Sequence, residues 1–466
     1  MSHVAVVLAA GQGTRMKSEL PKVLHEVAGR PMVSWVLEAV QATKPERLVV
    51  VVGHGADSVI DTLPEGVEWC IQEHRNGTGH ATQIALDALG GVDGLDVLVM
   101  PGDTPLITGD ALQELLDHHE ERAAGVTMLT AELADPTGYG RVVRDADGVT
   151  AIVEHRDADD ETRTIREINA GMYVFDGDTL AGDLASLRPE NAQSELYLTD
   201  VIGVVAGRGQ LVSAVVVPEE VVAGINTHEQ LAQASAVARR RILSGLMLEG
   251  VSVVDPEHTY IDAGVEIAAG AVIHPGCHLS GATRVAAGAI VGPDVFAEDS
   301  VIGTGSRVWY SVLRGADVGA NCDVGPYASL RPGAVLRSDA KAGTFVELKN
   351  AVVGEGAKVP HLSYMGDATV GAGANVGAGS ITCNYDGYEK NVTEIGEGAF
   401  IGSSTMLVAP VTVGDGAVTG AGSVITNDVP AGDLGLERSQ QRNIEGYAAR
   451  RAERYRRTRS ETDKEQ

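Results

Sequence analysis

Two cations follow a glycine loop close to the start of the chain. The segment LAAGQGTRMKSELPKVLH, residues 8–25, places Arg15 and Lys22 shortly after Gly11 and Gly13. Backbone N–H groups of such a loop can approach phosphate oxygens, and nearby cations neutralise their charge. The third glycine of a dinucleotide fingerprint and the GK[ST] of a P-loop are both missing here. The two cations nevertheless favour a phosphate site over a tight turn with solvated charges.

The C-terminal half carries a second set of polar residues within a pattern of small ones. Arg331 and Lys349 are 18 positions apart, and His361 lies 12 positions further on. Two cations suit a sugar phosphate. A neutral imidazole, with an unperturbed pKa near ~6.5, can act as a general base that takes a proton from a reacting group. We predict that His361 is this base; a surface histidine without a role is the alternative, against which the nearby Tyr364 argues. The polar segments are LRPGA at 330–334, VELKN at 346–350, HLSYMGD at 361–367, ANVGAG at 374–379 and TCNYDG at 382–387.

Short apolar runs must position the first set. The runs at 4–10, 48–52 and 96–100 are typical of buried strands, and the amphipathic stretches 32–43 and 78–90 separate them. This alternation, which continues to about residue 225, predicts a parallel α/β sheet with ligands at the carboxyl ends of its strands. Asp103 directly follows the third run, where a ligand would bind, although a simple turn former is the alternative.

A different period positions the second set. Residues 227–249 have helical apolar spacing and predict a linking helix. Beyond about residue 251, aliphatic residues recur every six positions, which predicts a parallel β-helix with three faces and 18 residues per coil. The period breaks after Ile381, where we expect an inserted loop. The repeating positions are Ile261, Ile267, Ile273, Leu279, Val285 and Val291; Val318, Val324, Leu330 and Leu336; Val353, Val359 and Met365; Val370 and Val376; Ile395, Ile401, Leu407, Val413, Thr419 and Ile425.

Composition limits the classes of function. The 466 residues carry a formal net charge of −28, which argues against a broad nucleic-acid or anionic-membrane surface and is typical of a soluble protein or of life in high salt. No segment approaches ~20 consecutive apolar residues, and the N-terminus lacks a signal-peptide layout. Cys70, Cys277, Cys322 and Cys383 show neither CxxC pairing nor metal-ligand spacing. We therefore expect free thiols and a cytoplasmic protein.

The N-terminal motifs resemble those of the sugar-nucleotide pyrophosphorylases, whose hallmark is GxGTRM followed by PK. The order and spacing of further segments are similar to the family of bifunctional N-acetylglucosamine-1-phosphate uridylyltransferases and glucosamine-1-phosphate N-acetyltransferases, over nearly the whole chain. This resemblance implies a Rossmann-like nucleotidyltransferase domain followed by a left-handed parallel β-helix of hexapeptide repeats. The further segments are Gln72 with GTGHA at 77–81, PGDTPL at 101–106, DPTGYGR at 135–141, VEH at 153–155, EINAG at 167–171 and GIN at 224–226.

The resemblance implies that a sugar-1-phosphate attacks the α-phosphorus of UTP and expels pyrophosphate. It implies Mg²⁺ on Asp103 and Asn226, whose oxygens are hard ligands; for Asn226, a helix N-cap is the alternative. Pro101 stands where related enzymes often carry an aromatic residue. The residues implied to bind the substrates are Leu8, Ala9, Ala10 and Gly11 on the uridine side, Arg15 and Lys22 at the phosphates, Gln72, Gly77 and Thr78 at uracil and ribose, Pro101, Gly102 and Asp103, Gly140, Glu154 and Asn169 at N-acetylglucosamine, and Asn226.

For the acetyltransferase, the resemblance implies that His361 is catalytic and that Arg331, Lys349, Tyr364 and Asn375 bind glucosamine-1-phosphate. The residues implied for acetyl-CoA are Ala378, Asn384, Tyr385, Ser403, Ala421 and Arg438. Arg438 lies in a tail with many arginines, so a solvated side chain is its alternative. The family is trimeric, and neighbouring subunits complete its acetyltransferase site.

We predict a nucleotidyltransferase domain at 1–226, a linking helix at 227–250, an acetyltransferase β-helix at 251–437 and a frayed basic tail at 438–466. The expected products are N-acetylglucosamine-1-phosphate and then UDP-N-acetylglucosamine, a cell-envelope precursor by resemblance, with no nucleic-acid or membrane partner. Two alternatives stay open: a pyrophosphorylase whose β-helix only oligomerises or regulates, and a trimeric scaffold or sugar-nucleotide sensor without activity.

Overall fold

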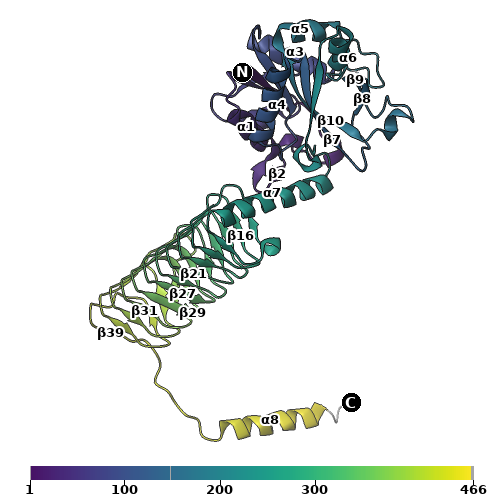
Figure 1. Ribbon diagram of the computed structural model, residues 1–466. Coiled ribbons are helices and arrows are strands. Elements are labelled where there is room, and N and C mark those ends of the chain that lie inside the picture. Colours follow the sequence, from purple (N-terminus) through teal and green to yellow (C-terminus); the bar gives the residue numbers. More distant parts are fainter. Residues whose placement is uncertain (1, 147, 463–466) are drawn as a thin grey trace. The chain divides into compact units, whose positions relative to one another are not determined.

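The computed structural model describes residues 2–146 and 148–462 and contains two compact units, Met1–Thr283 and Arg284–Gln466 (Figure 1). The finer boundaries at residues 226, 250 and 437 stay predictions, and residues 463–466 of the predicted tail lie outside the described part of the chain.

A mixed sheet forms the centre of the first unit. Strand β1 (His3–Leu8) is almost entirely buried and pairs in parallel with β4 (Arg47–Val52) and β6 (Asp96–Pro101), so the three expected strands form and their carboxyl ends meet at one edge. Strand β10 (Glu167–Asp176) is an exception, because it runs antiparallel between β6 and β7. The order is β11-β7-β10-β6-β1-β4-β5, and β8 joins β9 to β10. The other strands are β2 (Glu26–Val27), β3 (Arg30–Pro31), β5 (Glu68–Ile71), β7 (Val126–Glu132), β8 (Arg141–Asp145), β9 (Gly148–Val153) and β11 (Val212–Val216).

Helices cover both faces of this sheet (Figure 1). Alternate residues of β1 point to opposite faces. Ala5 and Val7 join an apolar cluster with α1 and α4, whereas Val4 and Val6 join another with α3, α5 and α6. The expected helices at 32–43 and 78–90 form as α1 and α3. The helices are α1 (Met32–Ala42), α2 (Ala56–Ile60), α3 (Thr78–Leu89), α4 (Gly109–Arg122), α5 (Gly177–Ser186) and α6 (Asp200–Gly207), with short 3₁₀ helices η1 (Thr14–Met16), η2 (Lys22–Leu24), η3 (Thr162–Thr164) and η4 (Glu219–Val221).

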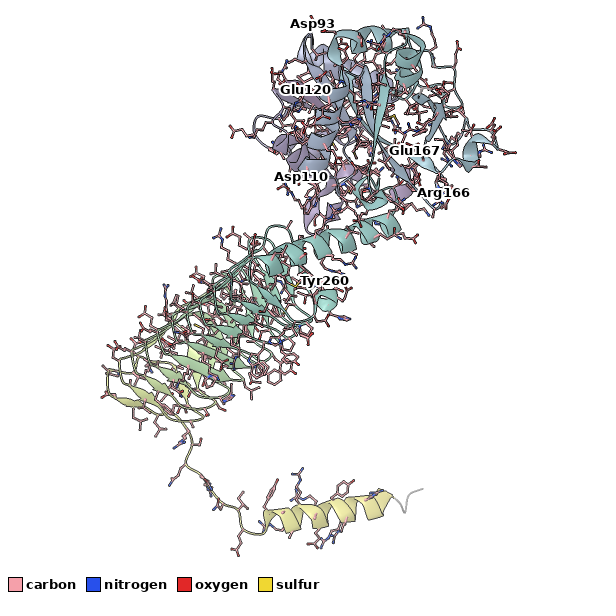
Figure 2. All side chains as sticks on the ribbon, viewed as in Figure 1. Asp93, Asp110, Glu120, Arg166, Glu167 and Tyr260 are labelled. Atoms are coloured by element: carbon pink, nitrogen blue, oxygen red, sulfur yellow. The ribbon has the colours of Figure 1, made fainter. Side chains whose placement is uncertain are left out.

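Helix α7 (His228–Leu248) forms within the range whose spacing predicts a helix. The side chain of Thr227 accepts a hydrogen bond from the backbone N–H of Gln230 at 3.2 Å and so caps its first turn. Arg239 lies over the ring of Tyr260, labelled in Figure 2, and Tyr260 stacks on His278 at 4.5 Å between ring centroids. These contacts attach α7 to the first β-helix strands of the same unit. Those elements are β12 (Ser252–Val253), η5 (Pro256–His258), β13 (Tyr260–Ile261), β14 (Glu266–Ile267), β15 (Val272–Ile273) and β16 (His278–Ser280).

Parallel ladders build the second unit, in which each strand pairs with the strand one coil further along. The expected β-helix with three faces therefore forms. One face comprises β18 (Ile290–Val291), β21 (Arg307–Val308), β24 (Asp323–Val324), β27 (Lys341–Thr344), β29 (Lys358–His361), β31 (Asn375–Val376), β34 (Phe400–Ile401), β37 (Val418–Thr419) and β39 (Leu434–Gly435). The second face comprises β19 (Phe296–Glu298), β22 (Val312–Arg314), β25 (Ser329–Leu330), β28 (Glu347–Val353), β30 (Tyr364–Val370), β32 (Ile381–Cys383), β35 (Met406–Val408) and β38 (Val424–Ile425). The third face comprises β17 (Arg284–Val285), β20 (Val301–Ile302), β23 (Asp317–Val318), β26 (Val335–Leu336), the ends of β28 and β30, β33 (Thr393–Ile395) and β36 (Val411–Val413).

The six-residue pattern corresponds to the inside of the coils. Every predicted inward position from Ile261 to Ile425 is buried, which confirms the pattern. Where the phase slips between residues 291 and 318, Ile302, Val308 and Leu313 take the inward positions. The expected insertion emerges between β32 and β33. The small interior explains the pattern, since one aliphatic side chain per short strand fills it.

Three further observations bear on the expectations from sequence. Cys322 is a buried free thiol, and Cys70 and Cys383 are half-buried free thiols. The tail is less irregular than expected, because α8 (Tyr447–Thr462) is helical. Among the described residues, no helix combines the length and apolarity needed to cross a membrane.

Two neighbouring residues of β20 test the inward pattern. Ile302 is 0% exposed and Val301 is 39% exposed. We expect Ile302→Ala to lower the free energy of unfolding by about 2–5 kcal/mol, because it leaves a cavity in the coil. The matched control Val301→Ala should cost less than about 1 kcal/mol. Denaturant unfolding followed by circular dichroism measures both; equal losses would contradict the inward assignment.

Candidate functional site

A cavity of about 490 Å³ lies in the first unit beside the glycine loop, and loops that follow β1, β5 and β6 line it. Most residues implied for uridylyl transfer line it together. Gly102 and Gly140 lie just behind its wall: the N–H of Gly102 donates to the carbonyl of Leu8 at 2.9 Å, and a Cβ on Gly140 would lie 3.4 Å from Oε1 of Glu154. The predicted residues that line the cavity are Leu8, Ala9, Ala10, Gly11, Arg15, Lys22, Gln72, Gly77, Thr78, Pro101, Asp103, Glu154, Asn169 and Asn226.

The glycine loop brings Lys22 next to its own backbone. Gly13 has a φ of 63°, and a Cβ at this position would lie 2.6 Å from Cβ of Lys22. Only glycine combines this left-handed conformation with so close an approach. The loop therefore folds tightly over Lys22, whose side chain is largely buried.

Lys22 bonds to both predicted metal ligands. Its Nζ donates to a carboxylate oxygen of Asp103 and, at 2.7 Å, to Oδ1 of Asn226. Nη2 of Arg15 donates to the same amide oxygen at 2.6 Å. The backbone N–H of Ile225 also bonds to the carbonyl oxygen of Asp103 at 3.0 Å, which holds the two segments together. Two cations and two hard oxygen donors thus converge at one end of the cavity.

Asn226 is free to serve this site, because Thr227 caps α7. The amide N–H₂ of Asn226 donates to the carbonyl of Gly224 at 3.3 Å, which orients Oδ1 toward the cations. The N-cap alternative for Asn226 is therefore wrong.

Gln72 is a buried lining residue that directly follows β5. Its backbone N–H donates to the carbonyl of Val52 at 2.8 Å, and its amide donates to the carbonyl of Gly77 at 3.1 Å. Thr78 begins α3, and its hydroxyl accepts the N–H of Leu198 at 3.0 Å. The side-chain amide of Gln72 is thus held in place, where it could recognise a flat heterocycle.

A third part of the wall comes from β10 and the segment after β9. The side chain of Asn169 is held between the hydroxyl of Tyr173 at 2.6 Å and the N–H of Gly171 at 3.0 Å. Burial raises the pKa of Glu154, the charge of Asp157 adds to this, and a hydrogen bond from Thr199 offsets part of it. These neutral and acidic acceptors suit the hydroxyl and amide groups of a sugar.

In the second unit, the register places Arg331 and Lys349 on successive coils, as their spacing predicts. Leu330 pairs with Leu348, and the N–H of Arg331 donates to the carbonyl of Leu348 at 2.8 Å. Arg331 also forms an ion pair with Glu347 at 2.9 Å. Both cations therefore project from the same edge of one face.

His361 and Tyr364 lie on either side of a corner. His361 ends β29 on one face, whereas Tyr364 begins β30 on the face that carries Lys349. Leu362 makes the turn between them with a φ of 51°. The expectation that His361 lies on a different face from the cations is confirmed. Asn375, in β31, shares the face of His361 and pairs with Lys358.

Lys390, on the inserted loop, is a cation that the sequence reasoning missed. The neighbouring amine of Lys349 lowers the pKa of Lys390, because a second positive charge nearby disfavours the protonated form. Asp367 lies between these amines and the amides of Asn350 and Asn384, which donate to it at 2.7 and 2.5 Å. Burial alone would raise the pKa of Asp367, but these bonds and cations bring it below its ordinary value. Two amines held this close suit a dianionic phosphate.

The small residues implied for acetyl-CoA form a row along successive coils. The carbonyl of Ala378 accepts the N–H of Ser404, the carbonyl of Ser403 accepts the N–H of Gly422, and the carbonyl of Ala421 accepts Nη1 of Arg438 at 3.1 Å. Arg438 is therefore attached to this row. Asn384 and Tyr385 lie on the inserted loop instead, where Tyr385 forms an isolated bridge with Lys390.

Further cavity residues were missed in the N-terminal half, among them Arg75, Glu195 and Thr199. Arg75 carried a signal, since it lies between Gln72 and Gly77. No sequence signal could have identified Glu195 and Thr199, because only the folding of their loop over α3 brings them to the cavity.

Comparisons with known proteins also distinguish a nucleotidyltransferase part from a hexapeptide-repeat part of the chain. Residues 5–168 match the model of the MobA-like NTP transferase domain, and residues 393–427 match the bacterial transferase hexapeptide (six repeats). A protein of Streptomyces coelicolor, "Bifunctional protein GlmU", is 53% identical over 96% of this chain and 94% of its own length. Proteins of the same name from Streptomyces avermitilis (51%; 96% and 94% of the two chains) and Brevibacillus brevis (47%; 95% and 96%) are also similar.

The chain belongs to the GlmU family. The similarity to GlmU proteins spans both groups of site residues. The cavity lies largely within the NTP transferase match, and Ser403 and Ala421 lie within the hexapeptide match.

Glu154 generates a prediction on stability. Because its folded pKa lies above its ordinary value of 4.5, the protonated form favours folding; this stabilisation is present below that value and is lost as the pH rises through the folded pKa. Glu154→Gln should therefore melt at a higher temperature than the unmodified protein at pH 8, and the difference should narrow toward pH 5. Calorimetry measures this. Glu195→Gln, which changes another carboxylate of the same cavity, is the control. A lower melting temperature of Glu154→Gln at pH 8 would count against the assignment.

Proposed function

We propose that this chain makes UDP-N-acetylglucosamine in two steps. It transfers acetyl from acetyl-CoA to glucosamine-1-phosphate, and then uridylyl from UTP to N-acetylglucosamine-1-phosphate, with release of pyrophosphate. GlmU membership over nearly the whole chain supports both activities. The observation that carries the first-unit assignment is the convergence of Arg15, Lys22, Asp103 and Asn226 at one end of the cavity.

In the uridylyl step, an oxygen of the sugar phosphate attacks the α-phosphorus of UTP. The bond to the β-phosphate breaks, and its electrons leave with pyrophosphate. Little covalent help is needed, so positioning and charge neutralisation dominate. Lys22 and Arg15 neutralise the phosphates, Gln72 and Thr78 hold the uridine, and Asn169 with Glu154 holds the N-acetylglucosamine.

Asp103 and Asn226 suit a magnesium ion. Their side-chain oxygens converge on one ammonium group in this structure, so they lie close enough to share a cation. Both are hard oxygen donors, and Mg²⁺ binds through few protein oxygens together with substrate phosphates. When bound, the ion neutralises phosphate charge. Lys22 must then turn from these oxygens toward the phosphates that it contacts.

In the acetyl step, the amine of glucosamine-1-phosphate attacks the thioester carbonyl. His361 takes the amine proton, the new amide bond forms, and the carbon–sulfur bond breaks to release the thiol of CoA. Arg331, Lys349 and Lys390 hold the phosphate, and Tyr364 and Asn375 orient the sugar. The row from Ala378 to Ala421, with Arg438, holds acetyl-CoA, and Asn384 and Tyr385 contact it from the inserted loop.

We also propose that the chain forms a homotrimer and acts in the cytoplasm. His361 and Lys349 lie on different faces of the coil, so a neighbouring copy could complete the site, which supports a homotrimer. UTP and acetyl-CoA are cytoplasmic metabolites, which supports a cytoplasmic enzyme. Neither site offers a broad basic surface for nucleic acid in a chain of net charge −28.

One experiment separates the two activities. Given glucosamine-1-phosphate, acetyl-CoA, UTP and Mg²⁺, free thiol and pyrophosphate are followed separately. His361→Ala should lower thiol release by about 100- to 10,000-fold, because the base is lost. It should leave pyrophosphate release from supplied N-acetylglucosamine-1-phosphate unchanged.

Asp103→Ala should leave thiol release unchanged and lower pyrophosphate release by about 100-fold or more, because the charge that develops in the transition state is no longer stabilised. Loss of both activities in one folded variant would overturn the two-site proposal. When N-acetylglucosamine-1-phosphate is also supplied, pyrophosphate without thiol from the unmodified protein would favour a pyrophosphorylase with a non-catalytic β-helix, and the absence of both products would favour the scaffold.

Lys390 supplies a prediction for the acetyl step. Lys390→Met keeps the length of the side chain and removes its charge, so KM for glucosamine-1-phosphate should rise about tenfold while KM for acetyl-CoA stays unchanged. Lys358→Met, on another face, is the control. An unchanged KM for the sugar phosphate would remove Lys390 from the site.

A further inference from the structure

Arg75 is a cation of the nucleotide cavity for which the proposed uridylyl transfer has no role. It lies on the loop between β5 and α3 and lines the cavity together with Arg15 and Lys22. Those two cations already bond to Asn226 and Asp103. Arg75 instead donates from Nη1 to the amide oxygen of Gln12 at 2.6 Å; Arg75 is exposed and Gln12 is half-buried.

The partner of Arg75 is neutral, which leaves its charge uncompensated. Within the described part of the chain, the guanidinium forms no ion pair. A guanidinium has five N–H donors in a planar fork, a geometry that matches phosphate oxygens. In a chain of net charge −28, a cation that faces a cavity without a carboxylate partner attracts an anion.

The position of Arg75 indicates which anion it meets. Gln12 belongs to the glycine loop, directly before Gly13, and Arg75 belongs to the loop that carries Gln72 and Gly77. The bond between Gln12 and Arg75 therefore connects the two loops that flank the nucleotide side of the cavity. The acceptors suited to the sugar, Asn169 among them, come from β10 and the segment after β9 instead.

We propose that Arg75 is a positioning residue that exchanges Gln12 for the β- and γ-phosphates of UTP. In this structure it bonds to Gln12 and connects the two loops. When the nucleotide binds, the fork turns to the phosphate oxygens that leave as pyrophosphate. This inference rests on the proposed uridylyl transfer, and it assigns the triphosphate end to a residue outside the implied set.

Kinetics in both directions test this assignment. In Arg75→Ala, KM for UTP and, in the reverse reaction, KM for pyrophosphate should each rise about tenfold or more, because a charge-assisted bond is lost from both ligands. KM for N-acetylglucosamine-1-phosphate, KM for UDP-N-acetylglucosamine and kcat should change less than about twofold. Arg75→Lys should recover part of the affinity. Arg122→Ala, which removes a charge at the end of α4, is the matched control.

Gln12 tests the exchange itself. Because Gln12 competes with phosphate for the guanidinium, Gln12→Ala should lower KM for UTP severalfold, and it should have no effect in an Arg75→Ala background. A rise in KM for UTP in Gln12→Ala would overturn the exchange. Unchanged KM values for UTP and pyrophosphate in Arg75→Ala would overturn the assignment of Arg75.

The unmodified protein separates these failures from failure of the proposed function. If it releases no pyrophosphate from UTP and N-acetylglucosamine-1-phosphate, the proposed uridylyl transfer is wrong. If it does, and Arg75→Ala behaves like Arg122→Ala, only the role of Arg75 is wrong.

Discussion

One buried ammonium group joins three distant parts of the N-terminal half. Lys22 follows the glycine loop, Asp103 follows β6, and Asn226 precedes α7, yet the Nζ of Lys22 contacts side-chain oxygens of both. A charge this deeply buried is costly unless it is paired and hydrogen-bonded, so this contact favours the meeting of the three segments. The same contact gathers the groups that we propose to neutralise phosphate. Stability and the proposed chemistry therefore depend on one arrangement, which a bound substrate and cation must rearrange.

A different constraint governs the β-helix. Its narrow interior takes one aliphatic side chain per short strand, which leaves only outward positions, corners and insertions for polar chemistry. The residues assigned to acetyl transfer follow this rule: Lys349 projects from an edge, His361 flanks a corner, and Lys390 lies on the insertion. The repeat thus acts as a rigid ladder, and the position of each functional group is set by its coil and face.

Predictability differs between these two parts for a physical reason. In a solenoid each coil contacts its neighbours, so sequence spacing translates directly into position. The 18-residue interval predicted that Arg331 and Lys349 lie on successive coils, and the burial of every inward position followed from the period. The period did not predict the position of Lys390, because Lys390 lies on an inserted loop that does not follow the six-residue repeat. In the α/β half, periodicity located the strands and the glycine loop but could not predict the antiparallel direction of β10, which depends on long-range pairing.

By itself the sequence determined the two architectures, the glycine loop and the family. The local spacing of small, aliphatic and charged residues is enough for each of these. Only the tertiary structure decided that Thr227, not Asn226, caps α7, and that Asn226 shares one ammonium with Asp103. It also decided that Arg75, on the loop after β5, bonds to Gln12 of the glycine loop. The bonds of Lys22 to Asp103 and Asn226 and of Arg75 to Gln12 join residues about 60 to 200 positions apart, and no local pattern encodes them, because the folded sheet brings its loops to one edge.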